Sequence, residues 1–207
     1  MWIKICGVKS VEAARAAEAA GADAIGINLH PPSPRYVEPA LAAEIARSVE
    51  IEVVIVVVNR TLDELEELVA EICPDTVQLH GDEPTHFGRG LTERGVKVQH
   101  MRAHRAHPTV LEEIAEEAGE RFLLDAFCET AHGGTGKRVD LDVARAAGAL
   151  GPMILAGGLN SENVAEVIEA AAPHGVDVAS GVESARGVQC LELIESFVKA
   201  ARSAASR

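Results

Sequence analysis

The chain has 207 residues, of which 47% are hydrophobic and 25% charged, which is enough for a globular protein with its own core. Its formal net charge is -13, and it holds one tryptophan, one tyrosine and four phenylalanines. It lacks both the positive charge that follows a phosphate backbone and the aromatic rings on which bases stack, so we expect no nucleic-acid partner. No apolar stretch approaches the roughly 20 residues of a membrane helix, and the N-terminus enters a strand without a basic leader. We therefore expect a cytoplasmic protein with no membrane partner.

Strand-like runs alternate with helical segments along the whole chain. Three Ala- and Glu-rich helical segments span residues 11–20, 62–72 and 163–171, and Ser10, Thr61 and Ser161 stand near their starts as candidate N-caps. The eight predicted strands are residues 3–6, 24–29, 53–58, 76–79, 96–101, 122–126, 153–156 and 176–179. This alternation predicts a parallel sheet.

A repeated pattern within the sequence favours a closed barrel over an open sheet. Asp23, Asp75 and Asp177 each end a Gly- or Pro-containing turn that leads from a helix toward a strand, at multiples of about 26 residues, the length of one of eight equal units. An Asp before a strand is also a common turn residue. An open doubly wound sheet usually carries a glycine-rich turn after its first strand, where this chain has Gly7 alone. We predict a single (β/α)₈ TIM barrel domain spanning residues 1–207.

The first strand ends in a cysteine and the sixth in a carboxylate, Cys6 and Asp125. In a (β/α)₈ barrel the carboxyl ends of the strands share one pocket, so this pair predicts a proton-transfer site. Lys4 favours the thiolate if its side chain shares the pocket.

Glycines follow strands seven and eight, as Gly157-Gly158 and Ser180-Gly181. Backbone N–H groups in such turns approach phosphate closely, and barrels commonly bind phosphate there, although glycines also serve simply as turn residues. Arg35 follows three prolines in the loop after strand two. The stiff loop would present its guanidinium to a planar carboxylate, and the alternative is a surface salt bridge.

The remaining candidates include the four cysteines at 6, 73, 128 and 190, which are too far apart for a zinc knuckle or a redox pair and are interpreted as free thiols. His80 is followed by Asp82, Glu83 and His86 in no familiar metal-site spacing, so no metal site is predicted. The acidic run from Glu112 to Glu117 is interpreted as a solvated helix face.

Several motifs agree in order and spacing with one enzyme family. They are residues 4–7 (KICG), 32–37 (PSPRYV), 77–81 (VQLHG), 123–125 (LLD) with 133–136 (GGTG), 155–159 (LAGGL) and 180–183 (SGVE). With them the chain resembles, from Lys4 to about Phe197, the phosphoribosylanthranilate isomerase family, (β/α)₈ enzymes of tryptophan biosynthesis.

The resemblance implies an Amadori rearrangement of N-(5'-phosphoribosyl)anthranilate to 1-(2-carboxyphenylamino)-1-deoxyribulose 5-phosphate, without a cofactor. It makes Asp125 the general acid and Cys6 the general base, and these roles need an Asp pKa raised above about 3.9 and a thiol pKa lowered below about 8.5. It implies that Arg35 binds the anthranilate carboxylate. It also implies that the phosphate is bound by Gly157, Gly158, Ser180 and Gly181. The further substrate-binding residues are then Lys4, Gln78, His80, Gly134 and Asp177. The partner is a small phosphorylated molecule, and the resemblance leaves monomer and homodimer open.

The chain also departs from the family pattern. Residues 137–141 read KRVDL where the family continues toward Phe-Asp-Trp, residues 188–190 read VQC where Lys-Asp is frequent, and residues 56–58 are valines where phenylalanine is usual. These changes leave room for a related aminosugar phosphate as substrate.

Three other readings compete with this one. The histidine-pathway isomerase performs the same rearrangement on the same barrel, but it has aspartate where this chain has Cys6. A non-catalytic binding barrel would not need both proton-transfer residues, and a structural barrel would not need polar strand ends.

Overall fold

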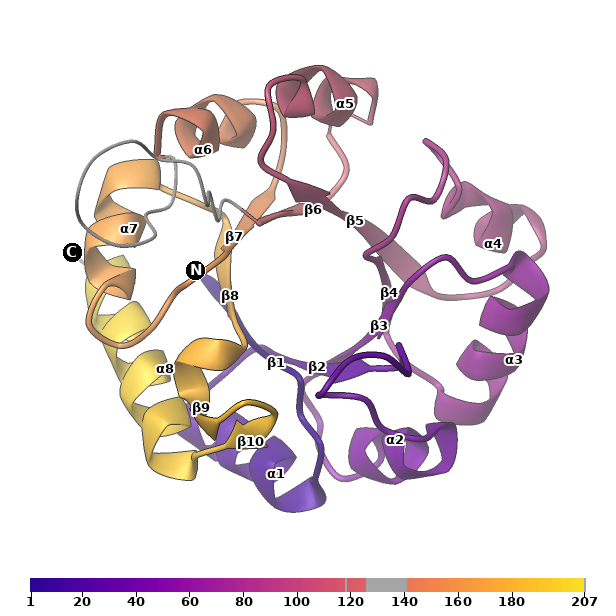
Figure 1. Ribbon diagram of the computed structural model, residues 1–207, viewed down its shortest axis with the longest axis horizontal. Helices are drawn as coiled ribbons and strands as arrows, with labels where there is room; N and C mark the ends of the chain where they lie inside the picture. The colour runs from indigo at the N-terminus through magenta and orange to yellow at the C-terminus, as the bar shows by residue number, and fades with distance from the viewer. Residues whose placement is uncertain (118, 126–140, 207) are drawn as a thin grey trace.

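Eight parallel strands close into a barrel in the computed structural model, which describes residues 1–117, 119–125 and 141–206 (Figure 1). The strands are β1 (Trp2–Cys6), β2 (Ala24–Asn28), β3 (Glu52–Val57), β4 (Thr76–Leu79), β5 (Gln99–Arg105), β6 (Phe122–Asp125), β7 (Met153–Ala156) and β8 (Gly175–Val178). Because β1 pairs with both β2 and β8, the sheet has no free edge. The predicted (β/α)₈ fold is confirmed.

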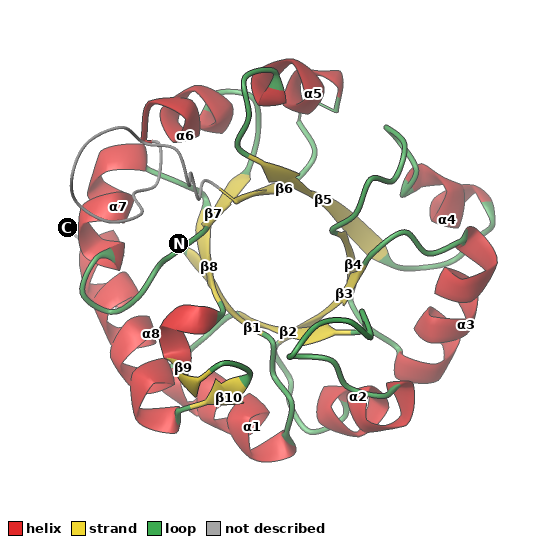
Figure 2. Cartoon of the chain, in the orientation of Figure 1, coloured by secondary structure: helices red, strands yellow, loops and turns green. Residues whose placement is uncertain are grey.

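Helices form a ring outside the barrel, as Figure 2 shows. They are α1 (Val11–Ala20), α2 (Pro39–Ala46), α3 (Leu62–Ile72), α4 (Arg89–Glu93), α5 (Val110–Glu116), α6 (Leu141–Gly148), α7 (Val164–Ala171) and α8 (Leu191–Ala205). After β8, a short 3₁₀ helix η1 (Ser180–Val182) leads into a hairpin of β9 (Glu183–Ala185) and β10 (Val188–Gln189). None of the helices in the described ranges is long and apolar enough to cross a membrane.

Two of the three predicted N-caps are confirmed. Ser10 accepts a hydrogen bond from Ala13 N, and Thr61 forms a capping box with Glu64. The prediction for Ser161 is wrong, because Asn160 Oδ1 accepts from the backbone N–H groups at the start of α7.

The predicted strand at residues 96–101 is wrong by several residues. β5 spans Gln99–Arg105, because residues 102–105 pair with residues 122–125 of β6. Val96 and Val98 instead lie in the connection from α4 and pack against the core. The polar side chains of β5 hide the apolar pattern from which a strand is predicted. Because β5 ends at Arg105, that residue lies at the mouth of the barrel.

The three regularly spaced aspartates, Asp23, Asp75 and Asp177, do not share one structural role. Asp23 Oδ2 accepts from Ile3 N, and Asp75 Oδ2 accepts from Val53 N, each at 2.8 Å. These two carboxylates cap the first backbone N–H groups of a neighbouring strand. Asp177 lies within β8 itself and is 7% exposed, so the prediction that it also leads into a strand is wrong.

Side chains alternate between the helices and the lumen of the barrel. On β1, Ile3 and Ile5 belong to the core shared with the helices. Trp2 packs inside the barrel against Ala24, Val54 and Met101. Lys4 and Cys6 have the same parity as Trp2 and therefore also face the lumen.

The amino end of the barrel is closed by a polar network around Glu52. Arg121 donates to both carboxylate oxygens, at 2.5 and 3.0 Å, Thr76 Oγ1 donates at 2.7 Å, and Trp2 Nε1 donates at 3.0 Å. The Arg121 guanidinium also stacks 5.1 Å from the centre of the Trp2 ring. Burial opposes ionisation of Glu52, but the hydrogen bonds from Arg121 and Thr76 outweigh it and hold its pKa below the ordinary value.

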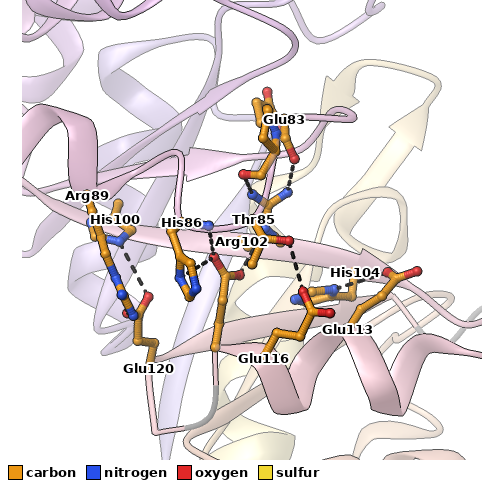
Figure 3. Close-up of polar contacts among 12 residues, drawn as sticks. Glu83, Thr85, His86, Arg89, His100, Arg102, His104, Glu113, Glu116 and Glu120 are labelled. Carbon is orange, nitrogen blue, oxygen red and sulfur yellow. Dashed lines mark hydrogen bonds and ion pairs between the residues drawn. The ribbon is translucent and has the colours of Figure 1, made fainter.

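A second polar network ties α5 to the β4–α4 loop, as Figure 3 shows. Arg102 of β5 donates to the carbonyl oxygens of Glu83 and Pro84 and to Glu117 Oε2. Glu117 also accepts from His86 N, and its side chain is only 11% exposed. The interpretation of residues 112–117 as a wholly solvated face is therefore wrong at Glu117, whose carboxylate holds the loop that follows His80.

His104 is the buried histidine of this network, with 5% of its surface exposed. Its ring meets Phe122 edge-on at 6.0 Å, and its Nδ1 lies 3.9 Å from Glu113 Oε2. Burial, together with the charge of Arg102, lowers the pKa of His104 below its ordinary value of 6.5.

We expect Glu52→Gln to lower the free energy of unfolding by roughly 1.5–3 kcal/mol, the usual contribution of hydrogen bonds to a charged group. Because the pKa of Glu52 is below 4.5 in the folded chain, this stabilisation is present above pH 4.5 and is lost as the pH falls through the folded value. Urea unfolding at neutral and acidic pH measures both effects. Glu67→Gln, on the exposed face of α3, is the control. Equal stability of the Glu52 variant and the wild type at neutral pH would contradict the prediction.

We expect the stability of the protein to fall as the pH drops below 6.5, because His104 resists protonation in the folded chain. His104→Gln should reduce that dependence, since it removes a group that binds its proton better in the unfolded state. Urea unfolding across the histidine titration range measures the slope, with His174→Gln as the control at an exposed position. An unchanged slope in the His104 variant would show that this histidine does not cause it.

Candidate active site

A cavity of about 730 Å³ opens at the carboxyl ends of the strands. It brings together most of the residues that the sequence singled out. Its lining includes Cys6, Arg35, His80, Asp125, Gly157, Gly158, Asp177 and Ser180. Lys4 and Gln78 are fully buried and lie outside that lining, and Gly181 also lies outside it. Gly134 lies outside the described residues.

The sequence missed several lining residues. Arg105 was missed because β5 was placed too early, and Asn28 was missed because it lies inside the predicted second strand. The true ends of β2 and β5 would have pointed to both residues, since strand ends line the mouth.

Cys6 and Asp125 lie on opposite sides of the mouth. Cys6 ends β1 and Asp125 ends β6, and Figure 1 shows these strands across the ring from each other. The register pairs Asp125 with Arg105 on one side and with Ala156 on the other. The cavity therefore lies between a thiol and a carboxyl group.

Lys4 lies directly below Cys6 in the lumen. Its Nζ donates to Asp177 Oδ1 at 2.9 Å, and the two side chains are 0% and 8% exposed. Gly26, on the adjacent β2, makes space for both β1 side chains. A Cβ atom there would lie 2.8 Å from Lys4 Cε and 2.9 Å from Cys6 Sγ.

The charges around Cys6 act in opposite directions. Burial raises the pKa of the thiol, the ammonium group of Lys4 lowers it, and the carboxylate of Asp177 raises it, with a net increase. The expectation of a lowered thiol pKa is therefore wrong. For Lys4, burial lowers the pKa, but Asp177 and Cys6 raise it by more, so Lys4 keeps its positive charge.

Arg35 both forms a salt bridge and lines the cavity, so the structure combines the two alternatives that the sequence left open. Its Nε and Nη2 donate to the two oxygens of Glu183 at 2.6 and 2.9 Å, and the residue also lines the cavity. Its stem lies over Gly7, where an added Cβ would be 2.5 Å from Arg35 Cδ. A guanidinium has five N–H donors, so this bidentate pair leaves donors on Nη1 and Nη2 for a second acceptor.

The turns after β7 and β8 pack against each other. Gly157 and Gly158 have φ values of 101° and 66°, which other residues rarely adopt. A Cβ at Gly181 would lie 1.9 Å from Leu159 O, so only glycine permits this approach. Gly157, Gly158 and Ser180 line the same side of the cavity, while Gly181 holds the two turns together.

His80 contributes a neutral imidazole to the cavity wall. Burial, and then the charge of Lys4, lowers its pKa. Its Nδ1 lies 2.7 Å from Nε2 of the buried Gln78. The amide donates to Nδ1, which leaves the ring proton on Nε2.

The family model described as N-(5'phosphoribosyl)anthranilate (PRA) isomerase matches residues 3–200 of the chain. An N-(5'-phosphoribosyl)anthranilate isomerase of Geotalea daltonii is 41% identical over 202 residues, which cover 97% of this chain and 96% of that protein. The corresponding protein of Geobacter metallireducens is 40% identical over 204 residues, covering 97% and 98%.

Solved structures agree with these sequence matches. The phosphoribosyl anthranilate isomerase of Thermotoga maritima superposes with a TM-score of 0.88 at 31% identity, over 98% of this chain and 99% of that one. A phosphoribosyl anthranilate isomerase solved in complex with reduced 1-(o-carboxyphenylamino)-1-deoxyribulose 5-phosphate superposes with a TM-score of 0.86 at 29% identity, over the same shares. The resemblance found in the motifs is confirmed, and the chain belongs to the N-(5'-phosphoribosyl)anthranilate isomerase family.

Proposed function

We propose that this chain catalyses the Amadori rearrangement of N-(5'-phosphoribosyl)anthranilate to 1-(2-carboxyphenylamino)-1-deoxyribulose 5-phosphate, a step of tryptophan biosynthesis. Asp125 is the general acid and Cys6 the general base. The observation that carries the proposal is one cavity with Cys6 and Asp125 on opposite sides, flanked by Arg35 and the glycine turns after β7 and β8. Membership of the isomerase family supports the same activity.

In the proposed mechanism, Asp125 gives its proton to the furanose ring oxygen while the C1'–O bond breaks. The nitrogen lone pair of the anthranilate forms the C=N bond of a Schiff base. Cys6, as thiolate, then removes the C2' proton, and the electron pair moves to give an enolamine. Proton transfer from the C2' hydroxyl to C1' yields the ketone. Cys6 then releases its proton to solvent and Asp125 takes one up, which restores both groups, and no external oxidant is required.

Substrate contacts follow the charges of the cavity. Arg35 binds the anthranilate carboxylate with the donors that Glu183 leaves available, and Gly157, Gly158 and Ser180 bind the phosphate through the two turns. His80 donates from Nε2, and Asp177 contributes a carboxylate to the lining. The valines 56 and 58 lie in the cavity wall, where they offer the anthranilate ring an aliphatic surface in place of the family's aromatic one.

The purified protein is expected to convert N-(5'-phosphoribosyl)anthranilate, generated from anthranilate and phosphoribosyl pyrophosphate, with loss of substrate fluorescence. Asp125→Asn and Cys6→Ser should each lower kcat by about 10²–10⁴, the usual contribution of a general acid or base. Cys73→Ser, at an exposed position, is the matched control and should keep full activity. Turnover that survives either active-site substitution would remove that residue's role. A folded but inactive wild type would point to another phosphorylated aminosugar.

Arg35→Met should weaken binding of reduced 1-(2-carboxyphenylamino)-1-deoxyribulose 5-phosphate by roughly 10- to 150-fold, since hydrogen bonds to a charged group contribute about 1.5–3 kcal/mol. Calorimetric titration measures the loss. The analogue without the carboxylate should bind the variant and the wild type equally, and Arg47→Met, at an exposed position just after α2, should change neither affinity. Equal losses for both analogues would show that Arg35 does not recognise the carboxylate.

A further inference from the structure

We infer that Lys4 is a positioning residue rather than a substrate contact, and that its ammonium group, which also pairs with Asp177, stabilises the thiolate form of Cys6 against the effect of burial. The inference rests on the proposed function, because it explains how a buried thiol becomes a base. Lys4 and Asp177 then control the ionisation of Cys6, because Lys4 favours the thiolate and Asp177 opposes it.

Burial separates Lys4 from the substrate. Lys4 is 0% exposed and does not line the cavity, whereas Cys6 and Asp177 do. A charged amine is rarely kept fully buried unless it has anionic partners. Asp177 is one such partner, at 2.9 Å. The ammonium group has three N–H donors, so the pair with Asp177 leaves donors for a second acceptor.

Cys6 lies beside the ammonium group of Lys4, next to Gly26 of β2. A Cβ atom built on Gly26 would lie 2.9 Å from Cys6 Sγ and 3.1 Å from Lys4 Nζ. The ends of both side chains therefore reach the same point beside Gly26. Lys4 and Cys6 are two residues apart on β1 and share its inner face. Only glycine at position 26 leaves space for both side chains.

Three charged groups act on Cys6 from the elements packed around it. Lys4 on β1 and Arg35 on the β2–α2 loop favour the thiolate, and Asp177 on β8 opposes it. Both oxygens of Glu183 already pair with Arg35, which leaves Lys4 as the main positive charge acting on the sulfur. When Asp177 is neutralised, Cys6 becomes the remaining anionic partner of Lys4 among these three groups, so the thiolate is favoured more strongly.

Two isosteric substitutions should therefore move Cys6 in opposite directions. In a background with Cys73, Cys128 and Cys190 changed to Ser, the rate of Cys6 alkylation by iodoacetamide is followed against pH and confirmed by peptide mass. Below the thiol pKa, Lys4→Met should slow the reaction by at least about tenfold, the effect of one pKa unit. Asp177→Asn should accelerate it. A merely structural role would not give opposite signs.

The same variants are also tested by the pH dependence of kcat/KM and by KM. Lys4→Met should shift the acidic limb of the kcat/KM profile to higher pH and leave KM nearly unchanged, whereas loss of a direct substrate contact would raise KM. Alkylation rates that change in the same direction for both variants would overturn the inference, as would a rise in KM alone. If Lys4→Met does not fold, slower alkylation in Asp177→Asn is sufficient to overturn it. Alkylation uses no substrate, so its outcome is distinct from failure of the proposed rearrangement.

Discussion

The two-residue alternation of side chains in a closed parallel barrel is the constraint on which the rest of this structure depends. Because the sheet closes on itself, every second side chain faces a narrow lumen that has to be filled. On β1 the alternation delivers Trp2, Lys4 and Cys6 to that lumen, one above another. A single strand therefore takes part in closing the amino end, in a central ion pair and in the proposed chemistry at the mouth.

The central ion pair of Lys4 and Asp177 is costly to bury and is not explained by stability alone. Taking two charges out of water can cost more than their attraction returns, and apolar residues often fill such positions equally well. The lumen also holds apolar side chains that are nearly inaccessible to solvent, among them Met101, Leu123 and Ile154. A charged pair kept among such neighbours, directly below a cysteine, is better explained by an electrostatic effect on that cysteine. The Glu52 network at the amino end contrasts with it, since three side chains donate four hydrogen bonds to that carboxylate and its pKa is lowered.

The sequence predicted the fold and the strand-end residues because both depend on local pattern. Apolar strand runs and the capping box at Thr61 are visible in short segments, and the ends of β1 and β6 already hold Cys6 and Asp125. The errors arise where partners are distant in the chain. β5 was misplaced because its polar residues are stabilised by β6 and α5, and Glu117 was assigned to solvent because its partner Arg102 is on another element. The pairing of Arg35 with Glu183 joins residues 148 positions apart, which no local pattern reveals.

The charge balance of the mouth bears on how an acidic chain would receive the anionic substrate that we propose. The formal net charge of -13 opposes such a ligand at long range, but exposed charges are screened beyond about 8–10 Å at physiological ionic strength. At close range two of the cationic side chains near the mouth already have partners, Lys4 with Asp177 and Arg35 with Glu183. Their positive charge is therefore largely balanced, so in the proposed function recognition would depend on directed N–H groups rather than on an excess of cations. A site of this kind favours ligands whose anionic groups fit the glycine turns and the remaining Arg35 donors, because a misplaced anion gains little from the surrounding field.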